Sequence, residues 1–374
     1  MEILFLSSRG PLVSLLQLTL NELGFNAGAV DGIFGQQTQT ALKAFQRANG
    51  IEESGITWPQ TWDALAPHMV QHDIYTTIPY SSAVLQVNLQ GLLRKFPYIQ
   101  ISTIGYSVMQ KRISAIKIGT GPVQVMYNAS HHANEWITTP LVMKFVQDYA
   151  RAYTAGGTIF DIPARELYEK TTLTVVPMVN PDGVDLVTGQ IKPGTYFYGS
   201  ALSMNNPPVD FPSGWKANIR GVDLNLNYPA GWETAKEIKF ANGYTQPGPR
   251  DYVGPYPLSE PESSAMASLT EQNSFALTIS YHTQGEVIYW KFEDYVVPRA
   301  EEIVRAMADA SGYIPDETPR YSAYAGYKDW FIQQYQLPGY TVEAGSGINP
   351  LPIADFDSIY ERNIGIMALG LSLA

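Results

Sequence analysis

Hydrophobic residues recur at helical spacing through the first 66 residues of the chain. The leucines at positions 12, 15, 16, 20 and 23 follow a helical period that ends at Gly24. A second such pattern covers residues 36–50, and ITWPQTWDAL, residues 56–65, predicts a short third helix. The intervening VDGIFG segment contains turn-forming residues. This pattern predicts a small three-helix domain over residues 1–68.

The following segment, residues 69–81, has mixed polarity and no clean period, so we interpret it as a linker. From about residue 82, β-rich runs alternate with amphipathic helical patterns. The predicted strands cover residues 123–130, 171–179, 275–283 and 340–345, and the predicted helices cover residues 137–153, 262–273, 297–313 and 357–373. Alternation of this kind predicts an α/β domain with a largely buried sheet over residues 82–374.

Composition narrows the classes of function. The chain has a formal charge of −11 and no run of basic residues, which argues against nucleic acid or an anionic membrane surface as partner. It contains no cysteine, so a metal site must use His, Asp or Glu. No apolar segment is long enough to span a membrane, and the first residues do not read as a secretory signal. We therefore expect synthesis in the cytoplasm.

Candidate site residues follow three of the predicted strands. His131, His132 and Glu135 follow the first, His282 ends another, and Glu343 ends a third. Ligands of open α/β sheets collect at the carboxyl ends of strands, and two histidines with one glutamate are a known set for catalytic zinc. The H-x-x-E spacing alone is weak evidence. The other two histidines, at positions 68 and 72, lie near the predicted linker without an acidic partner in sequence, and we expect them to be solvated.

The N-terminal segment resembles the peptidoglycan-binding domain of bacterial wall hydrolases. The residues that carry the resemblance are Leu16-Gln17, Val30 to Gly35, Thr38 to Gln46, and Thr61 to Leu65. This resemblance covers the whole segment and implies that the domain binds the cell wall.

From about residue 82 to the end, the chain resembles the zinc metallocarboxypeptidase family. The matching segments occur in the family's order: HHANEWITT, VNPDG, GVDLNLNYP, SYHTQG, YKDW and TVEAG. The branch that looks most similar is the bacterial γ-D-glutamyl-meso-diaminopimelate peptidases. The resemblance implies a mixed, mostly parallel sheet flanked by helices. It also implies one Zn²⁺ bound by His132, Glu135 and His282, with His131 packing or hydrogen-bonding beside them.

The same resemblance implies roles for further residues. Asp223 would orient the first zinc histidine, and Glu343 would act as general base toward a zinc-activated water. A cation should stabilise the oxyanion, and the candidates remain Lys216, favoured by spacing, and Arg220, favoured by chemistry. The residues expected to bind substrate are Asn225, Tyr321 as a mobile cap, and Lys328.

One departure bears on specificity. Exopeptidases of the family have an arginine after the asparagine that matches Asn225, and here that position is Leu226. Leucine cannot hold a terminal carboxylate, whereas Lys328 could pair with the far carboxylate of diaminopimelate. We therefore expect hydrolysis of the γ-D-glutamyl-meso-diaminopimelate amide in peptidoglycan or muropeptides, during sporulation, lysis or recycling. The alternatives are a conventional metallocarboxypeptidase, a small-molecule zinc deacylase, and a binding protein with a decayed site. The sequence leaves the oligomeric state open.

Overall fold

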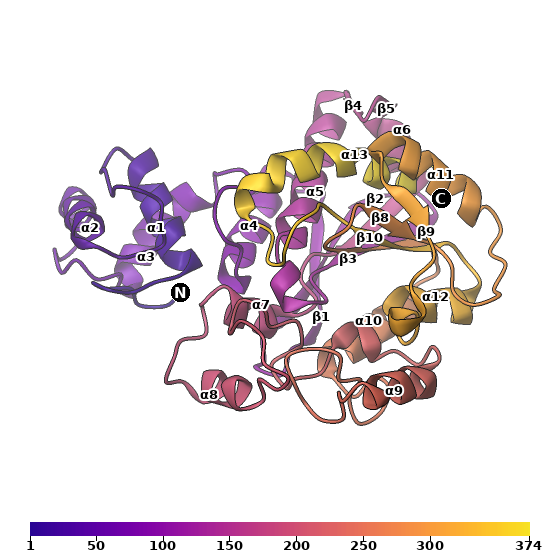
Figure 1. Cartoon of the computed structure of the whole chain (residues 1–374). Coiled ribbons are helices and arrows are strands. Elements are labelled where there is room, and N and C mark those ends of the chain that lie inside the picture. Colours follow the sequence, from indigo (N-terminus) through magenta and orange to yellow (C-terminus); the bar gives the residue numbers. More distant parts are fainter.

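The computed structural model describes all 374 residues and has a three-helix N-terminal domain beside a larger α/β domain (Figure 1). The helices of the N-terminal domain are α1 (Pro11–Glu22), α2 (Gln36–Ala48) and α3 (Pro59–Met69). The helices of the α/β domain are α4 (Ser82–Lys95), α5 (Thr138–Ala155), α6 (Ala164–Lys170), α7 (Pro181–Val187), α8 (Tyr196–Ser203), α9 (Trp232–Ala241), α10 (Pro261–Glu271), α11 (Ala300–Ser311), α12 (Tyr327–Tyr335) and α13 (Phe356–Ser372). None of the helices combines the length and the apolar character that crossing a membrane requires.

An eight-stranded mixed sheet forms the centre of the α/β domain. Its strands are β1 (Gln100–Tyr106), β2 (Arg112–Gly119), β3 (Val123–Ala129), β6 (Thr171–Val176), β7 (Phe275–His282), β8 (Val287–Tyr289), β9 (Ile314–Asp316) and β10 (Gly339–Glu343). They are ordered β1-β2-β6-β3-β7-β10-β8-β9, and the four central strands β6, β3, β7 and β10 are parallel. A separate hairpin contains β4 (Thr158–Ile159) and β5 (Ile162–Pro163). The predicted fold class is confirmed.

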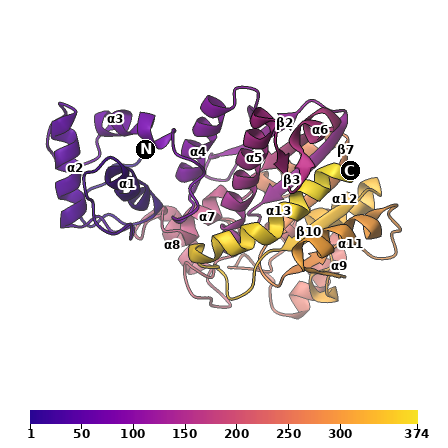
Figure 2. The same ribbon diagram turned by 90° about the horizontal axis from the view of Figure 1, so that it is seen from above.

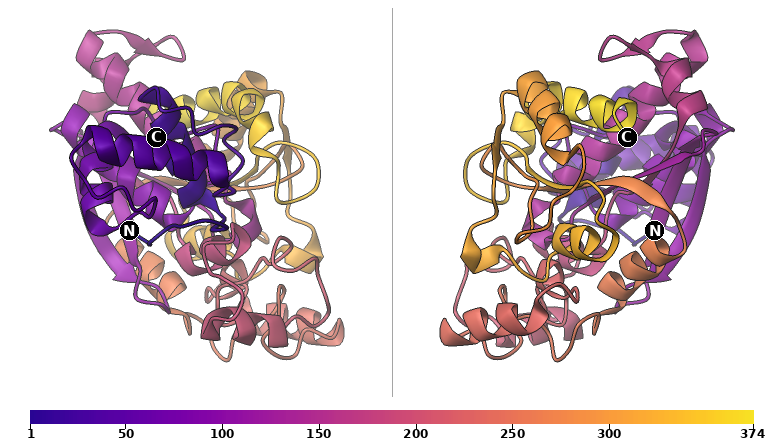
Figure 3. Two further views of the ribbon diagram at one scale, coloured as in Figure 1. Left: turned by 90° about the vertical axis from the view of Figure 1, so that its left-hand side faces the viewer. Right: turned by 90° about the vertical axis from the view of Figure 1, so that its right-hand side faces the viewer.

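Helices cover both faces of the sheet. Helices α5, α6, α11 and α13 lie on one side, and α10 and α12 lie on the other (Figures 1 and 3). The alternation of β3 shows why both faces need cover: Val125 and Tyr127 enter one hydrophobic core and Met126 enters the other. The parallel arrangement brings the carboxyl ends of β3, β7 and β10 to one edge of the sheet.

Two buried glutamines explain the motifs of the N-terminal domain. Gln17 in α1 accepts a hydrogen bond from the Gly32 backbone N–H and donates to Asp31 and Thr38, which fixes the VDGIFG turn. Gln46 in α2 accepts from the Gly55 N–H and also donates to the loop before α3. Because buried polar groups need partners, these glutamines specify the path of both loops. The predicted three-helix bundle is confirmed.

Residues 70–81 are packed against both parts of the chain. Ile74, Tyr75, Ile78 and Tyr80 are buried in a hydrophobic core that extends from the N-terminal helices to α5 and α13. Figure 2 shows α4 between the N-terminal helices and the rest of the α/β domain. Asp73 pairs with Lys95 and Arg151 in the α/β domain. The division at residues 69–81 stays a prediction, but this segment holds the two parts together through buried apolar contacts.

The two histidines near this segment have different surroundings. His68 is exposed on the last turn of α3, as expected of a solvated residue. The expectation for His72 needs correction, because its Nε2 lies 2.9 Å from Glu22 Oε1 and its ring stacks on Tyr75. The sequence did not indicate this partner, because Glu22 ends α1 and lies 50 positions before His72. His72 therefore joins the segment to the N-terminal domain.

Candidate active site

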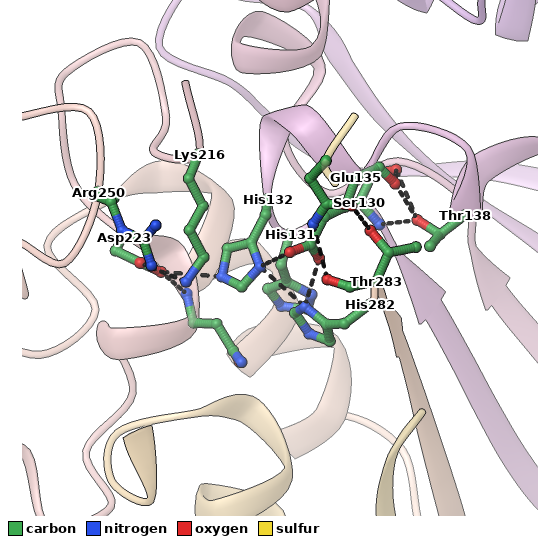
Figure 4. Close-up of polar contacts among 12 residues, drawn as sticks. Ser130, His131, His132, Glu135, Thr138, Lys216, Asp223, Arg250, His282 and Thr283 are labelled. Carbon is green, nitrogen blue, oxygen red and sulfur yellow. Dashed lines mark hydrogen bonds and ion pairs between the residues drawn. The ribbon is translucent and has the colours of Figure 1, made fainter. Parts of the chain in front are cut away.

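Three predicted ligands converge at the carboxyl edge of the sheet. His132 follows β3, Glu135 lies in the 3-10 helix η1 (Ala133–Glu135), and His282 ends β7. His132 Nδ1 lies 3.0 Å from Glu135 Oε1, and His282 Nδ1 lies 2.9 Å from Glu135 Oε2. The two Nδ1 atoms are themselves 3.0 Å apart. All three side chains are buried, and they point toward one another (Figure 4).

Asp223 fixes the orientation of the first histidine. This residue precedes the 3-10 helix η2 (Leu224–Leu226), and His132 Nε2 donates to its Oδ1 over 3.1 Å. With its proton on Nε2, His132 presents the Nδ1 lone pair to the common point. Burial opposes ionisation of Asp223, yet Lys216 and His132 hold its pKa well below its ordinary value. Two imidazole lone pairs and a carboxylate directed at one point fit a zinc ion.

His131 lies behind the ligands rather than among them. Its Nε2 is 2.9 Å from the Tyr228 hydroxyl, and its ring lies 5.8 Å from that of His282. Burial and the neighbouring histidines hold the pKa of His131 well below its ordinary value, so the ring is neutral. The expectation that it packs and hydrogen-bonds beside the site is confirmed.

Glu343 is the carboxylate without a protein partner at this edge. In the parallel pairing of β10 with β7, Glu343 lies opposite His282. Its side chain takes part in no hydrogen bond or ion pair, and it lines the same cleft as His132 and Glu135. Burial and the charge of Glu135 raise the pKa of Glu343 to about 8. A carboxyl group with a raised pKa beside a metal site is suited to accept and return a proton.

A polar cleft of about 560 Å³ opens above these residues. Only four of its 26 lining residues are hydrophobic, which indicates a strongly polar ligand. Its basic lining residues are Lys216, Lys239, Arg250 and Lys328.

The fold and the buried set of metal-binding side chains agree with comparisons to known proteins. Residues 86–363 match the family model for zinc carboxypeptidases. The chain belongs to this family. Residues 9–65 match the model for a peptidoglycan-binding domain, described there as putative.

Individual relatives give further detail. The chain is 46% identical, over 79% of its length and 72% of the relative's, to a gamma-D-glutamyl-L-diamino acid endopeptidase of Lysinibacillus sphaericus. It is 37% identical, over 77% of its length and 76% of the relative's, to an uncharacterized protein of Bacillus subtilis. The fold is also similar to that of bovine thrombin-activatable fibrinolysis inhibitor, with a TM-score of 0.61, 19% identity, and coverage of 79% of this chain and 96% of that one.

The structure separates the two candidate cations for the oxyanion. Lys216 lines the zinc carboxypeptidase cleft, with Nζ 3.1 Å from Asp223 Oδ2. Burial alone would lower the pKa of Lys216, but the charges of Asp223, Asp251 and Glu135 raise it, so the amine remains protonated. Arg220 does not line this cleft; it is 55% exposed and lies 3.7 Å from Glu260. The position of Lys216 in the cleft therefore favours it over Arg220 as the cation that stabilises the oxyanion.

The residues predicted to bind substrate have different surroundings. Asn225 lines the cleft and its Oδ1 accepts from the Tyr327 N–H, which leaves its Nδ2 without a protein acceptor. Lys328 also lines the cleft, but it is 4% exposed and its Nζ donates to Asp329 and to the Lys291 carbonyl. Tyr321 does not line the cleft; its ring centroid lies 3.4 Å from Lys239 Nζ.

The sequence did not reveal an ion-pair cluster in the cleft, in which Asp251 pairs with Lys239 and Arg250. Asp251 Oδ1 accepts from Lys239 over 2.5 Å, and its Oδ2 accepts from Arg250 Nε over 2.7 Å. The Asp251 backbone N–H donates to Asp223 over 3.2 Å. These residues come from α9 and a loop without a motif of their own. The only sequence signal in this region is the turn-forming segment G-P-R-D, residues 248–251. In the structure Asp251 has a positive φ of 65° there.

Proposed function

We propose that the protein hydrolyses the amide between a γ-D-glutamyl residue and meso-diaminopimelate in peptidoglycan stem peptides. The observation that carries this proposal is a zinc-ligand set beside Glu343 in a polar cleft that lacks the exopeptidase arginine. The 46% identical relative described as a gamma-D-glutamyl-L-diamino acid endopeptidase supports the choice of bond. The N-terminal domain supports the choice of polymer, because its family model is that of a peptidoglycan-binding domain.

Zinc at His132, Glu135 and His282 would supply the Lewis acidity that activates water and polarises the scissile carbonyl. Glu343 accepts a proton from the attacking water and then donates it to the leaving amine. Lys216 lies where its charge can offset the negative charge that develops on the carbonyl oxygen. Asp223 holds both His132 and Lys216, so one carboxylate positions a ligand and the oxyanion cation.

The cleft favours an endopeptidase over a conventional carboxypeptidase. Leu226 is buried among Trp232, Val253 and Ala325 and offers no donor to a terminal carboxylate. On the leaving-amine side, Lys328 is suited to the far carboxylate of diaminopimelate. Its present partner is Asp329, whose pKa burial raises although the charge of Lys328 opposes the shift.

The test is digestion of a synthetic L-Ala-γ-D-Glu-meso-diaminopimelate-D-Ala peptide by the zinc-loaded protein, followed by mass spectrometry. We expect L-Ala-D-Glu and a diaminopimelate-D-Ala dipeptide. The Glu343→Gln variant, loaded with zinc to the same stoichiometry, should give neither. Release of D-Ala alone would contradict the proposed bond and favour an exopeptidase.

A further inference from the structure

Arg250 is the cleft cation whose donors are least used within the protein. Lys239 and Lys328 are each 4% exposed or less and pair with Asp251 and Asp329. Lys216 is directed to Asp223. Arg250 is 48% exposed and donates to the protein only through Nε, to Asp251. Both terminal amino groups of its guanidinium therefore have no protein acceptor, which is the fork geometry that binds a carboxylate in a bidentate manner.

The surroundings of Arg250 hold this fork in place. Asp251 is 2% exposed and is itself fixed by Lys239 and by its backbone hydrogen bond to Asp223. On this wall, three cations (Lys216, Lys239 and Arg250) face two carboxylates (Asp223 and Asp251), which leaves one positive charge in excess. An arginine that is oriented beforehand and not neutralised is suited to an anionic ligand.

The position of Arg250 assigns it to the acyl side of the scissile bond. The carbonyl of Pro249, the preceding residue, accepts hydrogen bonds from the backbone N–H groups of Lys216 and Ala217. Arg250 thus lies beside the residue that faces the developing oxyanion. Figure 4 shows Arg250 next to Asp223 and Lys216, on the side of His132 that is away from His282.

We propose that Arg250 binds the free α-carboxylate of the γ-D-glutamyl residue. This inference rests on the proposed function and adds a determinant of specificity to it. In a γ-linked glutamyl residue, four carbon–carbon bonds separate the scissile carbonyl from the α-carboxylate, a span of about 5 Å when extended. The far carboxylate of diaminopimelate lies on the other side of the scissile bond, where Lys328 is the available cation. Arg250 and Lys328 therefore bind carboxylates on opposite sides of the scissile bond.

The consequence is discrimination between two acyl groups of nearly equal shape. A γ-D-glutamyl residue carries the charged α-carboxylate, whereas the α-amidated form, D-isoglutamine, carries a neutral carboxamide. A charge-assisted bidentate contact distinguishes such a pair by about 10–100-fold. We expect wild-type kcat/KM to be higher by that factor for the peptide with the free carboxylate.

The experiment compares these two synthetic peptides on zinc-loaded wild type, Arg250→Gln and Arg250→Lys. Arg250→Gln should lose about 10–100-fold in kcat/KM on the free-carboxylate peptide and little on the amidated one, so that the preference disappears. Arg250→Lys should retain part of the preference, because it keeps the charge without the fork. Arg165→Gln, at an exposed arginine of α6 paired with Glu169, is the matched control and should behave as wild type.

Inhibition by the product L-Ala-D-Glu, compared with L-Ala-D-isoglutamine, gives a second readout that does not depend on turnover. Equal losses on both peptides in Arg250→Gln, or an unchanged preference, would overturn the role of Arg250 and leave the proposed function intact. Failure of the wild type to cleave either peptide at the γ-D-glutamyl bond would overturn both. Zinc stoichiometry and circular dichroism confirm that each variant is folded.

Discussion

Replacing Asp223 with asparagine should weaken zinc binding or lower kcat without unfolding the protein. Asp223 accepts from His132 Nε2 over 3.1 Å and pairs with Lys216 over 3.1 Å. It also accepts from the backbone N–H groups of Asn225 and Asp251, each over 3.2 Å. An asparagine keeps the shape but has only one accepting oxygen, so its amino group must face a donor on one side. The change removes either the orientation of His132 or the partner of Lys216.

The size of the effect follows from these contacts. A partner of a metal-binding histidine typically contributes about 10–100-fold to metal affinity, which corresponds to about 1.4–2.8 kcal/mol. If the amide nitrogen faces His132, the imidazole carries its proton on Nδ1 and loses the lone pair aimed at the metal. If it faces Lys216, the loss appears chiefly in kcat. We therefore expect one of two results for Asp223→Asn. Either the zinc Kd rises by about 10–100-fold, or kcat falls by a similar factor.

The assay is competition for zinc between the protein and a chromophoric chelator, with kcat measured on the same preparations. Asp148→Asn is the matched control, since Asp148 on α5 accepts hydrogen bonds from Lys144 of the same helix and from Tyr360 of α13, outside the cleft. This control should bind zinc like the wild type. A zinc Kd and a kcat for Asp223→Asn both within about threefold of the wild type would refute the reasoning, because a contribution of about 1.4 kcal/mol is tenfold.

Three other changes give distinct results. Lys328→Met should reduce kcat/KM by about tenfold or more on diaminopimelate peptides and much less on lysine peptides; equal losses on both would exclude a contact with the far carboxylate. Burial and the charge of Asp182 raise the pKa of Glu262 to about 7 from 4.5, so folding stability should fall as pH rises through that interval. In metal-free protein unfolded by urea, Glu262→Gln should remove up to about 3 kcal/mol of this fall between about pH 5 and pH 8; an unchanged slope would contradict it. Chelation should abolish hydrolysis, and zinc should restore it in the wild type but not in Glu343→Gln, which a colorimetric amine assay would show.

The metal site was predictable because its residues follow local signals. His132 and Glu135 follow a β-rich run, and His282 ends another, so the sequence placed all three at strand ends. It could not establish that β3, β7 and β10 lie close together in the sheet, because strand order depends on long-range pairing. The family resemblance supplied that information, and the structure has the ligand atoms within 4.8 Å of one another.

Other features lacked a local signal. The edge strand β1 has mostly exposed or half-buried residues, so its pattern did not stand out as a buried strand. The segment around Ile74 and Tyr80 was interpreted as a linker because its apolar residues follow no regular period, although they are buried. Arg250 lies in a loop and is held by Asp251 through contacts that only the folded chain creates. Lys216 and Arg220 could not be distinguished because which side chain faces the cleft depends on the conformation of their loop.

Hydrolysis of L-Ala-γ-D-Glu-meso-diaminopimelate-D-Ala in ¹⁸O-labelled water tests the central claim most directly. Each hydrolysed bond adds one oxygen from solvent to the acyl product, so mass spectrometry identifies the bond that was hydrolysed. We expect a single ¹⁸O in the γ-carboxyl group of L-Ala-D-Glu and none in the diaminopimelate-D-Ala product. Label in a diaminopimelate carboxyl group after loss of D-Ala, or no product from the zinc-loaded protein, would contradict the account.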